Sequence, residues 1–338
     1  MFYNIQALRG VAAMLVLMHH ALPNFQAMNL SNSVVEFVGK FGYIGVDVFF
    51  VISGFVMAKT TIDKPKGLPL VKVFLSKRFL RIYLGFLPVF VLALLYYYQF
   101  NPGYLAKKEI LQSLTLINPN MFVLVISPAW SLTYELYFYL LVALLLFSNK
   151  TKPQIVFGML VFLVIVKNIT IPILQYRWLD FFLSSLLLEF ISGYFLCYYL
   201  DVLSKKKLLP LVVILGTISL GFGLYLNIGY GYMRVLTFGV FAFSLVWFFV
   251  LLEKNSVFVV KGFLKKIGDS SYTLYLTHTV LLGAFNTLGV RDYFVKKDIA
   301  MIGYILVIVF IIIFSMIFYR IIEAPLYNFF KKYLIKSY

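Results

Sequence analysis

Arg9 and His20 lie eleven residues apart in the first hydrophobic stretch of the chain. A cation and an imidazole are costly inside an apolar helix of membrane length, and such residues usually mark a functional path. Eleven residues at about 100° each make about three turns plus 20°, so both side chains share one helical face, about 16 Å apart along the axis. Taken alone, Arg9 could also snorkel to the interface, and His20 could be a satisfied interior histidine.

A second set of polar residues lies in the segment GVDVFFVISGF, residues 45–55. Asp47 stands at the start of an apolar stretch, where it would either complement a helix N-terminus or orient an imidazole. Ser53 and Gly54 would permit close helix approach and an interhelical hydrogen bond. Asp47 and Ser53 are therefore predicted to support a site on the acceptor side.

Two arginines, Arg78 and Arg81, are spaced to share a helical face at a membrane edge. Such a fork suits phosphate oxygens and is predicted to bind a phosphorylated donor. The alternative is that both are ordinary charges flanking a membrane span.

Glu135 occurs in the otherwise apolar segment PAWSLTYELYFY, with Ser131 one turn before it on the same face. A carboxylate in hydrocarbon is protonated or paired, so an Arg or His of another helix is the predicted partner. We predict a catalytic or site-supporting role for Glu135 and a supporting role for Ser131.

The segment SSYTLYLTH, residues 270–278, places Ser271, Tyr275 and His278 on one stripe of an apolar helix. The stripe should face a cavity or a helix interface, and Tyr275 and His278 are predicted to lie on the acceptor side. Near the end of the chain, Pro325 stops the last span and Glu323 could pair with basic residues.

These residues must be positioned by a membrane fold. The chain has 338 residues, of which 62% are hydrophobic and 13% charged, against about 25% charged residues in soluble domains. The single cysteine, Cys197, excludes a disulfide framework, and no metal site is expected. Arg9 interrupts the first apolar run and no cleavage site follows, so no cleavable signal peptide is expected. The net charge of +17 suggests nucleic acid at first sight, but its distribution fits cytoplasmic loops, and no nucleic-acid partner is expected.

Hydropathy predicts an all-α integral membrane protein with about ten transmembrane helices and one domain, residues 1–338, without an appended soluble domain. Alternating the loops between two sides leaves 21 of the 30 Lys and Arg residues on the side of the N-terminus and eight on the other. Both termini are therefore predicted to be cytoplasmic. Residues 110–127 are predicted to be re-entrant or interfacial. The predicted spans are 5–24, 42–59, 80–99, 128–148, 154–173, 181–200, 208–227, 233–252, 270–289 and 299–322.

The ordered set of motifs resembles the acyltransferase-3 family over nearly the whole chain. The motifs are Arg-x10-His in the first span, GVDVFFVISGF, RxxR, AWSLTYELYFY, SYTLYLTH and the closing IIEAP. The N-terminal 60 residues are most similar to the branch that acetylates exopolysaccharide and O-antigen. The resemblance departs in two places: Leu136 stands where relatives often carry a second glutamate, and no proline follows Arg81 closely.

The resemblance implies a multi-pass protein of the bacterial inner membrane. It would transfer an acyl group, usually acetyl from acetyl-CoA, to a hydroxyl of an envelope or exported polysaccharide, including lipid-linked glycans. No permanently bound cofactor is implied. His20 matches the essential histidine, Arg9 its paired arginine, Arg78 and Arg81 the donor-associated pair, and Glu135 the motif glutamate.

His20 is expected to remove the hydroxyl proton as general base, with an acyl-histidine intermediate as an alternative route. Two other functions fit intramembrane charges: a transporter or flippase for lipid-linked glycan, and a structural subunit of a polysaccharide assembly complex. Transport would favour inverted repeats with broken helices, which the sequence does not display. The motifs of the sequence do not specify the oligomeric state, the acceptor sugar or the acyl chain.

Overall fold

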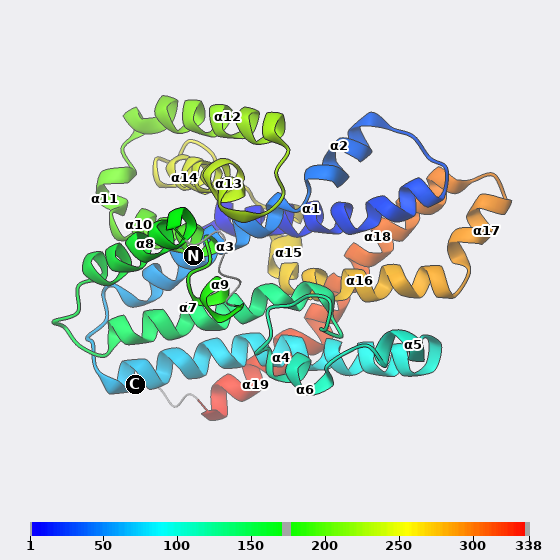
Figure 1. Ribbon diagram of the computed structural model, residues 1–338, viewed down its shortest axis with the longest axis horizontal. Coiled ribbons are helices and arrows are strands. Elements are labelled where there is room, and N and C mark those ends of the chain that lie inside the picture. The colour runs from blue at the N-terminus through cyan, green and yellow to red at the C-terminus, as the bar shows by residue number, and fades with distance from the viewer. Residues whose placement is uncertain (1, 171–176, 335–338) are drawn as a thin grey trace. The chain divides into compact units, whose positions relative to one another are not determined.

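The computed structural model describes residues 2–170 and 177–334, and every regular element in these ranges is a helix (Figure 1). The elements η1 and η2 are 3-10 helices, whereas η3 and η4 are π-helices. In chain order the elements are α1 (Tyr3–Ala27), α2 (Ser33–Phe41), α3 (Ile44–Thr61), α4 (Leu68–Phe100), α5 (Pro102–Leu105), α6 (Ile110–Thr115), η1 (Ser127–Ala129), α7 (Trp130–Leu146), α8 (Pro153–Thr170), α9 (Arg177–Phe182), α10 (Leu186–Tyr198), α11 (Leu200–Leu203), η2 (Lys206–Leu208), α12 (Leu209–Leu226), α13 (Gly231–Arg234), η3 (Val235–Gly239), α14 (Val240–Lys254), α15 (Phe263–Asp269), α16 (Ser271–Thr287), α17 (Val290–Lys296), α18 (Ala300–Phe318), η4 (Tyr319–Glu323) and α19 (Ala324–Leu334).

Within the described residues, eight helical runs are long and apolar enough to cross a membrane. Each of the ten predicted spans coincides with a helix or helical run. The two outside the eight are α8, whose apolar part is shorter, and α16, which has 17 residues. The all-helical, multi-pass membrane fold is thus confirmed, and the end of the predicted span 154–173 lies outside the described residues.

The segment 110–127 is not a spanning helix. It contains the short helix α6, and the irregular chain after α6 folds back onto this helix. The Val125 amide there donates to the Ser113 hydroxyl at 3.0 Å. The amide of Glu109 likewise donates to the Val123 carbonyl at 2.9 Å.

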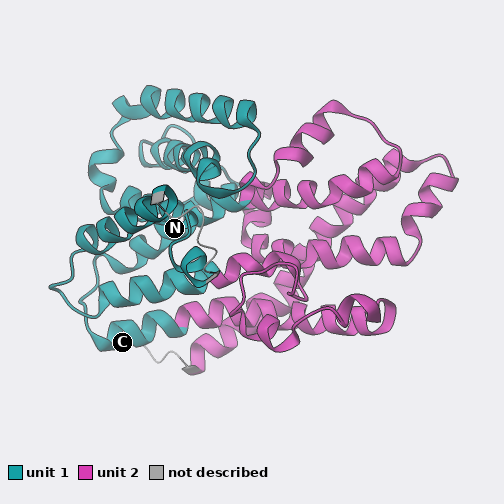
Figure 2. Ribbon diagram, viewed as in Figure 1, with its two compact units in different colours: residues 1–9, 46–76, 134–261 teal, residues 10–45, 77–133, 262–338 magenta. Residues whose placement is uncertain are grey.

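The chain divides into two compact units (Figure 2). Unit 1 comprises residues 1–9, 46–76 and 134–261, and unit 2 comprises residues 10–45, 77–133 and 262–338. The boundaries fall inside α1, α3, α4 and α7, so that each of these four helices contributes residues to both units.

In unit 1, helices α3 and α10 cross at two glycines. A Cβ added at Gly54 would overlap the carbonyl oxygen of Phe190, and one added at Gly193 would overlap that of Val51. Small residues allow such backbone approach in membranes, where dispersion contacts replace the hydrophobic effect as the force that joins helices. The close approach predicted for Gly54 is confirmed.

The start of α1 is fixed in unit 1 by Glu253 and Asn4. The first amides of a helix have no partner within the helix. Here the carboxylate of Glu253 accepts from the amides of Tyr3 and Asn4 at 2.8 and 2.6 Å. The Asn4 side chain, fully buried, donates to the carbonyls of Phe249 and Phe258 and accepts from the amide of Val260 at 2.7 Å.

Replacing Asn4 by alanine should therefore lower the free energy of unfolding by about 2–3 kcal/mol, because the fully buried amide would be lost and three partly buried backbone groups would each lose a hydrogen bond. Thermal unfolding of the purified protein in detergent measures this loss. Gln154→Ala is the matched control, since it removes a single exposed contact with the Tyr199 hydroxyl. Equal melting temperatures for the two variants would contradict the assignment of Asn4 as the anchor.

In unit 2, α1 packs closely against the start of α3 and against α15. A Cβ at Gly42 would overlap the carbonyl oxygen of Leu15, and one at Gly45 that of Ala12. At Gly10 a Cβ would lie 2.8 Å from the Gly268 amide nitrogen. These contacts hold the part of α1 that carries His20.

Candidate functional site

Helices α1 and α16 of unit 2 bring His20 and His278 together. Nε2 of His278 lies 3.2 Å from Nδ1 of His20, and the ring centroids are 4.9 Å apart. The two residues are 258 positions apart in the sequence. His278 is fully buried, whereas the ring of His20 remains exposed.

The carbonyls next to the two rings determine the tautomers. Nδ1 of His278 lies 3.0 Å from the Leu274 carbonyl, so this nitrogen carries the proton and Nε2 is the acceptor. Nδ1 of His20 lies 2.9 Å from the Val16 carbonyl and therefore also carries a proton, which it shares with Nε2 of His278. This assignment follows from the hydrogen-bond network. It leaves Nε2 of His20 unprotonated, on an exposed ring.

His19, the next residue, is oriented away from this pair. Its Nδ1 lies 2.8 Å from the Gly39 carbonyl of α2, and its ring packs edge-on against Tyr43. Its ring is also edge-on to that of His20, with centroids 5.2 Å apart. His19 therefore faces the neighbouring helix α2.

The predicted stripe on α16 faces a helix interface, because Ser271, Tyr275 and His278 are all buried. The Tyr275 hydroxyl lies 2.9 Å from that of Ser131 and 3.0 Å from the Pro128 carbonyl. Tyr275 and Ser131 thereby join α16 to the start of α7, and their contacts are those of helix packing.

The arginine pair on α4 meets a carboxylate of the π-helix η4. Nη1 of Arg81 donates to Oε1 of Glu323 at 2.5 Å, and the Thr273 hydroxyl donates to Oε2. The guanidinium of Arg81 also lies over the ring of Tyr272, 5.4 Å from its centroid. The predicted pairing of Glu323 with a basic residue is confirmed. The pairing occupies Nη1 of Arg81. Arg78 lies one turn earlier on α4 and is half-buried.

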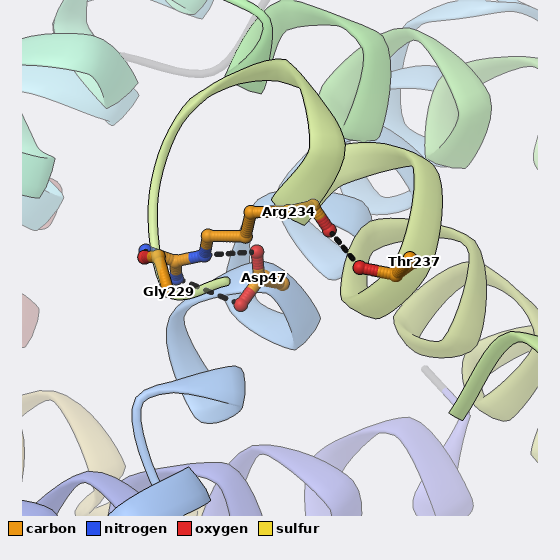
Figure 3. Close-up of polar contacts among 4 residues, drawn as sticks. All are labelled: Asp47, Gly229, Arg234 and Thr237. Atoms are coloured by element: carbon orange, nitrogen blue, oxygen red, sulfur yellow. Dashed lines mark hydrogen bonds and ion pairs between the residues drawn. The ribbon is translucent and has the colours of Figure 1, made fainter. Parts of the chain in front are cut away.

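In unit 1, Asp47 is paired with Arg234 (Figure 3). Nε and Nη2 of Arg234 donate to the two oxygens of Asp47 at 3.0 and 2.8 Å, and Nη1 donates to the Gly229 carbonyl. Asp47 is 0% exposed. Arg234, the last residue of α13, lies next to the π-helix η3 and is the counter-ion of a buried carboxylate. The side chain that Asp47 contacts is therefore a guanidinium.

Glu189 of α10 belongs to the same neighbourhood. It is 2% exposed, and its Oε1 approaches Gly239, where a Cβ would lie 2.8 Å away. Its carboxyl lies within hydrogen-bond reach of Asp47 and interacts electrostatically with Arg234. In the sequence, Glu189 stands in an apolar segment outside the motifs described above.

Glu135 has hydroxyl partners in unit 1. Its Oε1 accepts from the hydroxyls of Tyr139 at 2.5 Å and Ser53 at 3.3 Å. Among the described residues its hydrogen-bond partners are these hydroxyls rather than an Arg or His, and Tyr139, one turn further along the same helix, follows from the spacing. Glu135 is only half-buried, which lets its second oxygen meet other groups.

Arg9, also half-buried, lies on α1, which is continuous from Tyr3 to Ala27. The predicted spacing of Arg9 and His20 along one helix therefore holds. Unit 2 contains His20, Arg78, Arg81, Ser131, Tyr275 and His278, and unit 1 contains Arg9, Asp47, Ser53 and Glu135.

The model of the acyltransferase-3 family, described as an acyltransferase domain, matches residues 2–320. The chain belongs to this family. No curated protein and no solved structure matches the chain. Membership of this family and the apolar helices together make the protein a membrane acyltransferase.

The residues that sequence reasoning missed are the partners of the predicted site residues. The resemblance drew attention to His20 and Glu135, but not to the pairing of His20 with His278 or of Asp47 with Arg234. Two signals were available: an isolated aspartate in an apolar segment needs a cation, and two histidines on apolar helices need acceptors.

Proposed function

We propose that this acyltransferase transfers acetyl from acetyl-CoA to a hydroxyl of a cell-envelope or exported polysaccharide, with His20 as the general base. The acceptor class includes O-antigen, exopolysaccharide and lipid-linked glycan. The protein would act in the inner membrane of a bacterium. The acyl donor, the acceptor and the lipid bilayer are the partners of this reaction.

The single observation that supports this proposal is the state of the His20 imidazole. Its Nδ1–H is held by the Val16 carbonyl and by Nε2 of His278, and Nε2 of His20 is left as the basic atom. A sugar hydroxyl is a weak nucleophile at neutral pH and needs a base within hydrogen-bond reach. A ring with one nitrogen fixed as a donor and the other exposed meets this need.

The proposed reaction proceeds by one attack. The acceptor oxygen attacks the thioester carbonyl carbon while its proton passes to Nε2 of His20. The tetrahedral intermediate then collapses, the C–S bond breaks, and the proton on His20 passes to the CoA sulfur. The products are an O-acetyl ester and CoA. During the attack, His278 would stabilise the imidazolium by accepting the Nδ1–H hydrogen bond, as the aspartate does in serine hydrolases.

Arg9, Arg78 and Arg81 are proposed to bind the phosphates of CoA. Guanidinium groups suit phosphate oxygens, and Arg81 keeps further donors besides the Nη1 that meets Glu323. Glu135 and the hydroxyls around it are proposed to support the site without forming a covalent intermediate.

Mass spectrometry of envelope polysaccharide tests the function. Cells that produce the protein should carry an acetyl mass on one sugar that deletion of the gene removes, and a plasmid copy should restore it. The plasmid copy with His20→Ala should not restore it although the protein reaches the membrane. An unchanged acetylation pattern in the deletion strain, with normal glycan export, would contradict the proposal, and loss of exported glycan itself would favour a transporter.

A further inference from the structure

Helices α1 and α16 are joined by a second polar contact besides the histidine pair. Nδ2 of Asn286 donates to Oδ1 of Asn24 at 2.8 Å. Asn24 follows His20 by one turn on the same face of α1, about 6 Å along the axis. The order of the two contacts shows that α1 and α16 run in the same direction in unit 2 (Figure 1).

The two carboxamides retain unused hydrogen-bonding groups. Each has one carbonyl oxygen and two N–H donors. The bond between them leaves Nδ2 of Asn24 and Oδ1 of Asn286 without a hydrogen bond in the described part of the chain. Reversing the orientation of both amides would exchange the free donor and acceptor but keep one of each. Both residues are half-buried, so a ligand can reach them.

Two hydroxyl groups lie next to the asparagine pair: that of Thr287, which follows Asn286 on α16, and that of Tyr96 on α4. The Thr287 hydroxyl donates to the Gly283 carbonyl at 3.1 Å, so the Tyr96 hydroxyl is the donor in their 2.8 Å contact. The lone pairs of the Tyr96 oxygen stay available as acceptors. Tyr96 packs on Gly283, where a Cβ would meet its hydroxyl oxygen at 3.7 Å.

This set of groups is neutral and presents donors and acceptors next to an aromatic ring. A charged ligand would leave its charge uncompensated there, whereas each hydroxyl of a sugar both donates and accepts. We propose that Asn24 and Asn286 bind hydroxyl groups of the acceptor sugar and bring a neighbouring hydroxyl to Nε2 of His20. This inference rests on the proposed function and deepens it, because it assigns where the acceptor is held.

Kinetics of the purified full-length protein in lipid nanodiscs tests the assignment. The donor is acetyl-CoA, and the acceptor probe is the polysaccharide fraction of the producing cells after alkaline removal of its esters. Asn24→Leu and Asn286→Leu remove the amides but keep the number and branching of the side-chain heavy atoms. Each should raise KM for the polysaccharide about tenfold, the effect of one lost hydrogen bond of usual strength. KM for acetyl-CoA and the slow hydrolysis of acetyl-CoA without acceptor should not change.

Ser315→Ala is the matched control. It removes a buried contact between α18 and α16, in which the hydroxyl oxygens of Ser315 and Thr277 are 3.1 Å apart. It should leave KM for the polysaccharide unchanged. If the asparagine variants instead lower hydrolysis and transfer equally, or leave KM for the polysaccharide at the wild-type value, the contact only joins helices and the inference is wrong. A wild-type protein that hydrolyses acetyl-CoA but acetylates no polysaccharide would overturn the proposed function, and the acceptor site with it.

Discussion

The His20→Ala variant is expected to lose acyl transfer by about 10²- to 10⁴-fold, the usual contribution of a positioned general base. His20 is an exposed residue whose Nε2 makes no hydrogen bond among the described residues, while its Nδ1 is held by Val16 and His278. Alanine keeps the helix but would leave the hydroxyl of the proposed acceptor without the proposed proton acceptor. Release of CoA by membranes containing equal amounts of the variant and the wild type measures the effect.

His19→Ala is the matched control for this loss, since it removes the adjacent imidazole, whose Nδ1 contacts the Gly39 carbonyl of α2. It should keep most of the transfer activity. His278→Ala should give an intermediate loss of about tenfold, because one hydrogen bond to the imidazolium disappears while the base remains. Equal activities of the His20→Ala and His19→Ala variants would remove His20 from the reaction.

The sequence predicted the elements of this region because the relevant information is local. The eleven-residue spacing of Arg9 and His20 has a meaning only on a helix, and α1 is continuous through both. The spacing of Ser271, Tyr275 and His278 similarly predicted a buried face of α16, which the structure has. Helical periodicity and the cost of polar groups in hydrocarbon were sufficient for these predictions.

The pairings could not be predicted, because they join residues far apart in the chain. Arg234 and Asp47 are 187 positions apart, and Arg81 and Glu323 are 242 apart. Each pair also lies beside a π-helix, η3 or η4, whose wider turn changes which side chains share a face. Helical spacing at 100° per residue fails there, so the faces of Arg234 and Glu323 could not be derived from it.

Among the ion pairs of the described residues, loss of the Asp47–Arg234 pair is expected to lower the free energy of unfolding most. Arg234→Met should lower the free energy of unfolding by about 3–5 kcal/mol, because Asp47, fully buried, would lose both of its guanidinium contacts. The neighbouring carboxyl of Glu189 would increase the penalty. Thermal unfolding and the yield of monodisperse protein in detergent measure the loss.

The double variant Asp47→Leu with Arg234→Met should recover most of that loss, because a buried ion pair exchanged for apolar side chains is often neutral or stabilising. Glu189→Gln removes the carboxyl but keeps the size of the side chain, so this change should alter the free energy of unfolding by less than about 1 kcal/mol. If the double variant is as unstable as Arg234→Met, the guanidinium acts through its shape and its bond to the Gly229 carbonyl rather than as a counter-ion. Recovery would instead show that Arg234 is needed because Asp47 is buried, which assigns the pair to the framework of unit 1.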